Sequence, residues 1–359
     1  MHNPLDVVGP LGHEVGVAVV GAGYWGPNLI RNFMNSTSTW LWTVCDLNVD
    51  RARQVVGRHT SIRVTDDFEE VLHDRRIEAV AIVTPAATHH PLAMRAIEAG
   101  KHVLIEKPLS TSAALAREIV AAAEERGVTV MCDHTFCYTP AVARIRADLA
   151  SGALGALQYV DSTRVNLGIV QPDTNVFWDL LPHDLSILDS VLPHGFRPVS
   201  VSATGVDSIG AGHATVGYVT LMLPGNVIAH IHVSWLSPVK IRRTVFGGSR
   251  RHLLWDDTNP AQRISLYECG VDISQMQNSD QQRERMVQYR TGDMLAPALP
   301  EYEALGVVVN EFARSVRTGI APLCDGQSGV RVLEVLEAVN ESLRRGGDRV
   351  ELTTSGVMA

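Results

Sequence analysis

Residues 15–26 read VGVAVVGAGYWG, an apolar run that leads into a glycine-rich turn. Gly21, Gly23 and Gly26 have the G-x-G-x-x-G spacing found where a strand is followed directly by a helix. The first glycine permits a tight turn, the second lets a pyrophosphate approach the backbone, and the third lets the helix pack closely. The helix N-terminus then faces the phosphates. This stretch therefore predicts a dinucleotide-binding βαβ unit.

The next apolar run supports the same prediction. WLWTVCD (40–46) is typical of a second strand, and it ends in Asp46, 20 residues after Gly26. A carboxylate at this distance can bind the adenosine ribose 2′-hydroxyl group. Asp46 would repel a 2′-phosphate, and no arginine is adjacent, so NAD is favoured over NADP. The alternative is that Asp46 only caps the following helix.

The pattern around this motif predicts two domains. Apolar strands alternate with helical segments over residues 15–134, which indicates a Rossmann-type, doubly wound parallel sheet. β-alternating runs joined by Gly, Pro and Asn turns follow over 135–345, which indicates an α+β domain with an open, mostly antiparallel sheet. Residues 1–14 are predicted to be a disordered leader, 272–293 a mobile polar excursion, and 346–359 a tail. Two helices are predicted near 301–318 and 326–345.

Composition excludes several classes of function. The net charge is −8 and no basic run exceeds two residues, so a nucleic-acid partner is not expected. No apolar stretch is long enough to cross a membrane. The five cysteines are odd in number and irregularly spaced, which favours reduced thiols and a cytoplasmic location. Cys132, His134 and Cys137 lie close together without an evident fourth ligand, so no metal is predicted.

Lysine usage draws attention to one strand. Only three of the 31 basic residues are lysines, and two of them lie in KHVLIEKPLS (101–110). Lys101 follows the helix-ending Gly100 and is interpreted as a solvated cation that arginine could replace. Lys107 should lie at the carboxyl edge of the sheet, where doubly wound folds bind ligands. There its ammonium group could stabilise an alkoxide, unless it is simply a surface lysine. Pro108 ends the strand, and the bond before it is a candidate for the cis form.

A second candidate site lies in NVFWDLLPHDLSILDSVL (175–192). Asp179 and His183 are four residues apart, which places them on one face of a helix. Because Pro182 is best tolerated in a first turn, the helix is predicted to begin at about residues 179–182. An imidazole with a carboxylate partner is a suitable general base for an alcohol proton. Asp184 is a rival partner for the histidine, and a capped helix with a satisfied histidine is the structural alternative.

The chain resembles the glucose–fructose oxidoreductase / inositol dehydrogenase / MocA family over almost its whole length. The resemblance rests on GAGYWGPN, VTPAATHHPLAMRAIEAGKHVLIEKPLS, the D-x-x-x-H pair and GVRVLEVLEAVNESLRRGG. It implies that Lys107 acts at the substrate with Asp179 and His183, and that the C-terminal sheet mediates a homodimer or homotetramer. It also implies an NAD site; with the residues named above, the predicted cofactor contacts are Gly21, Gly23, Tyr24, Trp25, Gly26, Asp46, Thr84, Pro85, His89, Glu106 and Lys107.

Within the family, the chain is most similar to the branch that acts on nucleotide-linked sugars. That similarity implies oxidation of a sugar hydroxyl group, at C3, with His183 as base, Asp179 orienting it and Lys107 tuning the hydroxyl. The predicted substrate contacts are His134, Tyr138, Arg164, Asn166, Trp235, Lys240 and Arg242. Surface solvation is the alternative for the basic residues, and core packing for Trp235. A free-polyol dehydrogenase, a ketosugar reductase and a non-catalytic NAD(H)-binding protein remain open.

Overall fold

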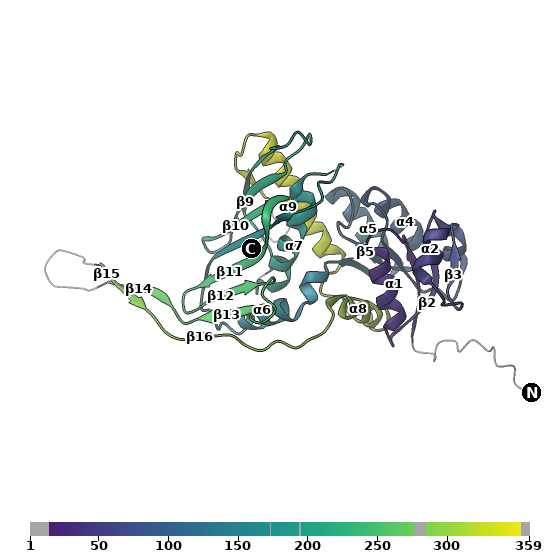
Figure 1. Cartoon of the computed structure of the whole chain (residues 1–359), viewed down its shortest axis with the longest axis horizontal. Coiled ribbons are helices and arrows are strands. Elements are labelled where there is room, and N and C mark those ends of the chain that lie inside the picture. Colours follow the sequence, from purple (N-terminus) through teal and green to yellow (C-terminus); the bar gives the residue numbers. More distant parts are fainter. Residues whose placement is uncertain (1–13, 173, 194, 276–284, 353–359) are drawn as a thin grey trace, which may run out of the picture. The chain divides into compact units, whose positions relative to one another are not determined.

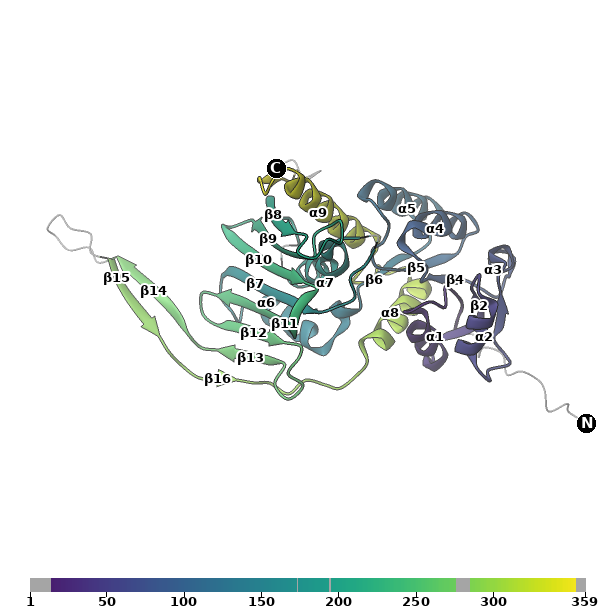
Figure 2. The same cartoon turned by 45° about the horizontal axis from the view of Figure 1, so that its top comes forward.

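A six-stranded parallel sheet forms the centre of the first of two units into which the chain divides (Figures 1 and 2). The computed structural model describes residues 14–172, 174–193, 195–275 and 285–352. The first unit comprises residues up to 139 together with 302–334, and the second comprises 140–301 together with the residues from 335 onward. The predicted division left 302–334 in the second domain, whereas their contacts place them in the first unit.

The first sheet has the order of a doubly wound fold, β3-β2-β1-β4-β5-β6, as the sequence predicts. All residues of β1 and β4 are buried, because helices cover both faces of the sheet. Figure 2 shows α4 and α5 on one side and α1 and α8 on the other. The strands are β1 (Val15–Val20), β2 (Thr39–Cys45), β3 (Arg63–Thr65), β4 (Ala79–Ile82), β5 (His102–Glu106) and β6 (Val130–Asp133).

Side-chain caps mark the starts of three helices in this unit. Asp67 accepts a hydrogen bond from the Glu69 backbone N–H at 2.8 Å, Ser112 accepts one at the start of α5, and Asn48 caps α2. The helices are α1 (Gly26–Asn35), α2 (Val49–Val56), α3 (Phe68–His73), η1 (Ala86–Thr88), α4 (His89–Glu98), α5 (Ala113–Arg126), η2 (Thr135–Tyr138), α8 (Ala304–Thr318) and α9 (Gly326–Arg344). Residues of α9 beyond 334 belong to the second unit.

The second unit contains an open sheet of nine strands in the order β16-β13-β12-β11-β7-β10-β9-β8-β17. All neighbours are antiparallel except β7 and β10, which confirms the predicted mostly antiparallel sheet. The strands are β7 (Leu157–Leu167), β8 (Ser200–Val206), β9 (Val216–Leu223), β10 (Val227–Ser234), β11 (Leu236–Gly248), β12 (His252–Asp256), β13 (Ile264–Tyr267), β16 (Met294–Leu295) and β17 (Val350–Glu351). Helices α6 (Pro140–Ala150) and α7 (Val176–Val191) pack together, and α7 lies against β9 and β10.

Two segments are more regular than the sequence suggests. The polar stretch 272–293 is predicted to be a mobile excursion, and the structure adds that β14 (Gly270–Gln275) and β15 (Arg285–Arg290) pair as an antiparallel ribbon. Figures 1 and 2 show this ribbon projecting from the large sheet. The predicted tail begins at residue 346, but Val350 and Glu351 pair with β8 and complete one edge of the sheet. The leader as far as residue 13, residues 276–284 and the tail after 352 lie outside the described residues.

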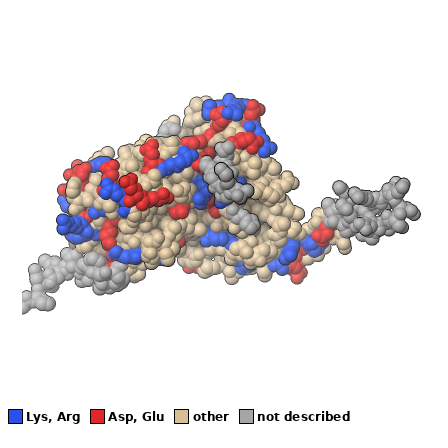
Figure 3. Space-filling view, turned by 180° about the vertical axis from the view of Figure 1, so that it is seen from behind, with Lys and Arg blue, Asp and Glu red and all other residues tan. Residues whose placement is uncertain are grey.

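The surface carries charges of both signs. On the face seen in Figure 3, Lys and Arg side chains are interspersed with Asp and Glu. Within the described ranges, no helix combines the length and the hydropathy that a membrane span requires. The five cysteines are free thiols, four of them buried.

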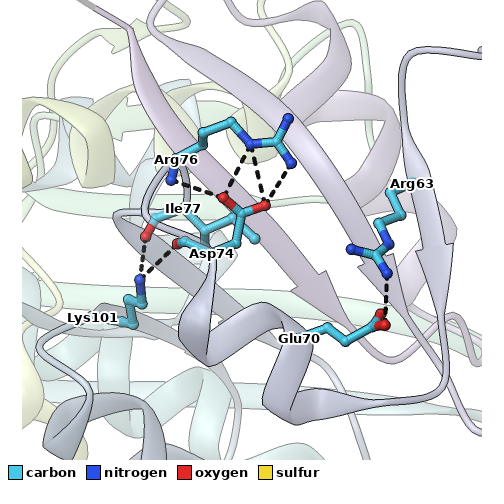
Figure 4. A network of polar contacts seen from close by, with 6 residues as sticks. All are labelled: Arg63, Glu70, Asp74, Arg76, Ile77 and Lys101. Atoms are coloured by element: carbon cyan, nitrogen blue, oxygen red, sulfur yellow. Dashed lines mark hydrogen bonds and ion pairs between the residues drawn. The ribbon is translucent and has the colours of Figure 1, made fainter.

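Lys101 corrects one interpretation of the sequence. Its side chain is only 8 % exposed, and Nζ donates hydrogen bonds to the backbone oxygens of Asp74 (3.0 Å) and Ile77 (2.7 Å). Figure 4 shows the ammonium group pointing at these two carbonyls, which lie between α3 and β4. The Asp74 carboxylate is held in turn by Arg76, at 2.7 Å. Lys101 thus joins the loop between α4 and β5 to the loop between α3 and β4 by buried hydrogen bonds, and this role needs a compact donor.

We therefore expect Lys101→Arg and Lys101→Met each to lower the free energy of unfolding by about 1–3 kcal/mol, because a charged hydrogen-bond donor to buried carbonyls is lost or displaced. Urea unfolding followed by circular dichroism measures this. Lys240→Arg and Lys240→Met are the matched controls, since Lys240 is exposed, and they should change stability little. Wild-type stability in Lys101→Arg would restore the solvated-cation interpretation.

Candidate active site

The glycine-rich loop between β1 and α1 is tightly packed on one side and open on the other. Gly21 has a φ of 106°, and a Cβ there would lie 2.6 Å from the Val83 carbonyl oxygen. A Cβ on Gly26 would lie 2.3 Å from the Gly21 oxygen. At Gly23, by contrast, a Cβ would meet no atom within 4 Å. Close packing behind the loop and open space at Gly23 fit a pyrophosphate that approaches the backbone.

Asp46 lies at the carboxyl end of β2, directly against this loop. Its Oδ2 accepts a hydrogen bond from the Ala22 backbone N–H at 2.5 Å, and its Oδ1 accepts one from Asn48 N at 2.7 Å. The helix α2 is capped by Asn48, not by Asp46, so the simple capping alternative is wrong. A carboxylate has about four acceptor positions, so Asp46 keeps capacity for a ribose hydroxyl group.

Arg51 is a residue of this loop region that the sequence analysis missed. Its Nε donates to the Ala22 oxygen at 2.6 Å and one of its terminal nitrogens donates to the Gly23 oxygen at 2.8 Å. The guanidinium group therefore fixes two carbonyls of the turn. The signal was present, since the first turns of α2 follow Asp46 and face the glycine loop, but helical position alone did not identify the contact.

The ends of β4 and β5 are joined by a buried histidine. His89 Nε2 lies 2.7 Å from the Thr84 oxygen and Nδ1 lies 2.8 Å from the Pro108 oxygen. Burial lowers the pKa of His89, whereas the two carbonyls act to raise it. His89 was predicted to line the cofactor, but both ring nitrogens are engaged by backbone, so it holds two strand ends together. Pro85 follows Thr84 and precedes η1.

Lys107 follows β5 at the carboxyl edge of the sheet, and its side chain is half-buried. The Lys107–Pro108 peptide bond is cis, as suggested from the sequence. The adjacent Glu106 turns its carboxyl group inward toward Asp133 rather than toward the loop. In the glycine loop itself, Tyr24 is 89 % exposed and Trp25 is half-buried.

Helix α7 begins earlier than predicted. Asn175 caps it, accepting hydrogen bonds from the N–H groups of Phe177 and Trp178 at 3.1 Å each, so the helix starts at Val176. Pro182 therefore lies inside the helix, in its second turn, where it removes one backbone hydrogen bond. The expected start at residues 179–182 was wrong because the cap at Asn175 outweighs the proline. Asp179 still lies in the first turn.

Asp179 is held in place by a buried tryptophan. The Trp235 indole N–H donates to Asp179 Oδ2 at 2.9 Å, and Trp235 is only 1 % exposed. The edge of His213 packs on the same ring, with centroids 5.9 Å apart. Trp235 thus packs in the core, and its polar edge orients the candidate catalytic carboxylate. His183 follows one helical turn later and is half-buried.

Two glycines allow α7 to approach the sheet. Gly205 on β8 and Gly217 on β9 face each other, and a Cβ on Gly217 would lie 2.0 Å from the ring of Phe177. A Cβ on Gly205 would lie 2.8 Å from the same ring. The Phe177 ring therefore lies directly over the glycine pair, which sets the position of the first turn of α7 and hence of Asp179.

Asp184 is not available to His183. Its carboxylate accepts from Arg164 Nε at 2.6 Å and from Ser162 Oγ at 2.8 Å, and the arginine is 4 % exposed. Adjacent helical residues point in different directions. Asp184 therefore points to Arg164, while the candidate base His183 projects from another side of the helix. Arg164, predicted as a substrate contact, is committed to this pair.

The other predicted substrate contacts are distributed over both units. Asn166 is half-buried, and its amide lies beside Gly168 and Trp235. Lys240 is exposed on β11, and the half-buried Arg242 pairs with Asp257 at 3.5 Å. In the first unit His134 is buried, and Tyr138 is 6 % exposed with its hydroxyl oxygen accepting from the Cys324 N–H. Burial raises the pKa of Tyr138, which keeps the phenol neutral.

Residues 15–134 match the model of an oxidoreductase family with an NAD-binding Rossmann fold. Among curated relatives, UDP-N-acetylglucosamine 3-dehydrogenase of Acidithiobacillus ferrooxidans is 27 % identical, over 91 % of this chain and 98 % of that protein. The NAD-linked scyllo-inositol 2-dehydrogenase of Bacillus subtilis is 30 % identical, over 54 % of this chain and 58 % of that protein.

Solved structures extend the similarity to the whole fold. A putative oxidoreductase from Magnetospirillum magnetotacticum superposes with a TM-score of 0.74 at 30 % identity, covering 90 % of this chain and 99 % of that one. GenD2 from gentamicin A biosynthesis, solved in complex with NAD, superposes with a TM-score of 0.78 at 25 % identity, covering 95 % and 97 %.

Proposed function

Because this chain belongs to the Gfo/Idh/MocA family of NAD-binding oxidoreductases, we propose that it is an NAD-dependent dehydrogenase of a sugar secondary hydroxyl group. The observation that carries the proposal is the Asp179 carboxylate, oriented by a buried indole one turn before His183. The same chain has a glycine loop and Asp46 that fit a dinucleotide, and a lysine at the end of β5.

The proposed roles follow from the chemistry of each side chain. Bound NAD supplies the acceptor for the hydride that leaves the carbinol carbon. His183 takes the hydroxyl proton on a ring nitrogen, and Asp179 orients the imidazole and stabilises its cationic form. Lys107 donates a hydrogen bond to the same oxygen and stabilises negative charge as it develops there. In the reverse direction His183 returns the proton to a ketosugar oxygen.

We propose C3 of a nucleotide-linked sugar as the position oxidised. Support comes from the full-length similarity to a UDP-N-acetylglucosamine 3-dehydrogenase. Asn166, Lys240 and Arg242 are the proposed contacts to sugar or diphosphate. Arg164 is left out, because its guanidinium group is already paired with Asp184.

A free-polyol dehydrogenase is the second candidate. The partial similarity to an inositol dehydrogenase favours it, and so does the loss of Arg164 as a diphosphate contact. A ketosugar reductase would use the same residues in the opposite direction. A non-catalytic NAD(H)-binding protein is disfavoured, because such a protein has no need of Lys107, Asp179 and His183 together.

The test is to incubate the protein with NAD and a panel of UDP-, GDP- and dTDP-sugars plus inositol, and to follow NADH by its absorbance. We expect turnover of at least one nucleotide sugar. Turnover of inositol alone would replace the nucleotide-sugar proposal by the polyol one. Absence of turnover in both directions, with NADH and ketosugars as the reverse test, would favour the binding-protein alternative.

Assembly and location complete the proposal. The outer face of the large sheet carries partly exposed Tyr218 and Ile228, and Tyr218 stacks on His232 with centroids 4.4 Å apart. This face supports pairing with a second copy of the chain, as a homodimer or homotetramer. Free, mostly buried thiols are in keeping with the cytoplasm.

A further inference from the structure

Two carboxyl groups lie buried behind Lys107. Glu106 ends β5 and Asp133 ends β6, and the two residues are register partners in the parallel sheet. Register partners in a parallel sheet project from the same face, so the two carboxyl groups lie side by side, and each acts on the pKa of the other. Within the described residues, no N–H or O–H group of the protein meets Glu106 Oε2 or Asp133 Oδ2 with hydrogen-bond geometry. Two ionised carboxylates could not share this position, because both would be acceptors and both would be charged.

The contact made by Asp133 Oδ1 indicates which of the two carboxyl groups carries the shared proton. Thr135 Oγ1 donates to Asp133 Oδ1 at 2.7 Å, which favours the ionised form of Asp133. Glu106 has no comparable donor from a side chain. Burial and the charge of Asp133 raise the pKa of Glu106 well above its usual range, and burial raises that of Asp133 as well. Glu106 is therefore the better proton holder of the two.

The pair lies close to a residue proposed to act on the substrate and to a residue of the glycine loop proposed to hold the cofactor. Lys107 follows Glu106 directly in the chain, and its charge and its backbone N–H both act to lower the pKa of Glu106, against the larger effect of burial. The indole of Trp25, from the glycine loop, lies beside Asp133. Cys132 precedes Asp133 on β6, so its side chain projects from the opposite face of the sheet; burial raises the pKa of its thiol, so it stays neutral. The pair and Lys107 are thus the charged groups of this cluster.

We infer that Glu106 is held as a carboxylic acid that donates to the Asp133 carboxylate, so that the pair presents a single negative charge to Lys107. The pair is a positioning element for the lysine, and it rests on the proposed role of Lys107. One charge anchors the ammonium group at the strand end. Two charges would draw it inward, away from the substrate oxygen. Glu106 then makes no contact with the cofactor, unlike the prediction from the family resemblance.

Glu106→Gln is the decisive variant, because a glutamine amide reproduces a donating carboxylic acid. We expect NADH affinity and kcat/KM within about twofold of wild type, whereas Glu106→Ala, which leaves Asp133 without its donor, should lose about tenfold in kcat/KM. NADH affinity is measured by fluorescence titration. A large loss of NADH affinity in Glu106→Gln would show that Glu106 acts as an ionised acceptor for the cofactor and would overturn the inference.

A spectroscopic readout tests the proton itself. At neutral pH the infrared difference between wild type and Glu106→Gln should contain the C=O stretch of a protonated carboxylic acid. Asp133→Asn should remove the same band, because its amide can donate to an ionised Glu106. Glu118→Gln, at an exposed glutamate, is the matched control and should leave the band in place. A wild-type protein without the band contradicts the inference.

The pH dependence of stability gives an independent test. The folded pair keeps a proton that an unfolded glutamate loses above about pH 4.3, so the folded state binds more protons and wild-type stability falls as pH rises. The melting temperature of Glu106→Gln relative to wild type should therefore increase from pH 5 toward pH 8. A difference that stays constant over this range would refute the shared proton. The infrared and melting experiments need no substrate, so their failure is distinguishable from failure of the proposed sugar dehydrogenase activity.

Discussion

His183→Ala is expected to lower kcat for sugar oxidation by about two to four orders of magnitude, the usual contribution of a positioned general base. Affinity for NAD should stay unchanged, because the proposed cofactor contacts all lie in the first unit and His183 lies in the second. Steady-state kinetics with the best substrate of the panel measures the first effect, and fluorescence titration with NADH measures the second.

Two further variants sharpen this experiment. Asp179→Asn keeps an acceptor for the Trp235 indole but removes the charge that stabilises the imidazolium, so its kcat should fall less than in His183→Ala. His90→Ala is the matched control, because His90 pairs with Glu118 on the surface of the first unit. Retention of near wild-type kcat by His183→Ala would remove the histidine from the mechanism and leave Lys107 as the remaining candidate.

Gly217→Ala is expected to lower the free energy of unfolding by about 1–3 kcal/mol, the usual cost of overpacking. Its new Cβ would lie 2.0 Å from the ring of Phe177, so either β9 or the first turn of α7 has to move. Because Asp179 lies in that turn, kcat should fall as well, while NADH affinity stays at its wild-type value. Thermal unfolding and the same kinetic assay measure the two effects.

The reason for the loss is tested by a second substitution. Phe177→Leu replaces the aromatic ring by a smaller branched side chain, so the double variant Phe177→Leu/Gly217→Ala should be more stable than the sum of the single effects predicts. Gly306→Ala, at a helix position where the nearest atom would be 3.4 Å away, is the control and should be neutral or slightly stabilising. Strict additivity in the double variant would mean that the clash is not the cause.

Much of the first unit could be predicted from the sequence, because its signals are local. The glycine spacing, the strand that ends in Asp46 and the alternation of strands and helices are each readable within about 30 residues. The cis bond before Pro108 was readable in the same way. The assignment of segment 302–334 to the first unit was not predicted, because nothing in its own sequence pattern indicates which unit it joins.

The details of the site could not be predicted, because they depend on contacts between distant residues. Trp235 and Asp179 are 56 positions apart, and a lone tryptophan gives no sign of its partner. Arg164 was interpreted as a substrate contact because its partner Asp184 lies 20 positions away. Lys101 was misread for the same reason, since its acceptors are backbone oxygens 24 and 27 positions earlier.

The division of the chain also bears on how the protein is made. The first unit needs residues 302–334, and the second needs those from 335 onward, including the strand β17 at residues 350–351. A ribosome synthesises the chain from its N-terminus, so residues 302–334 and those from 335 onward are added only after the middle of the chain. Neither unit can therefore be completed while the middle of the chain is still being translated. The glycine loop and the helices α1, α4 and α5 can form early, but α8, which also covers the sheet, is synthesised late. Completion of both units therefore waits for residues 302–352, so the two units do not fold strictly one after the other.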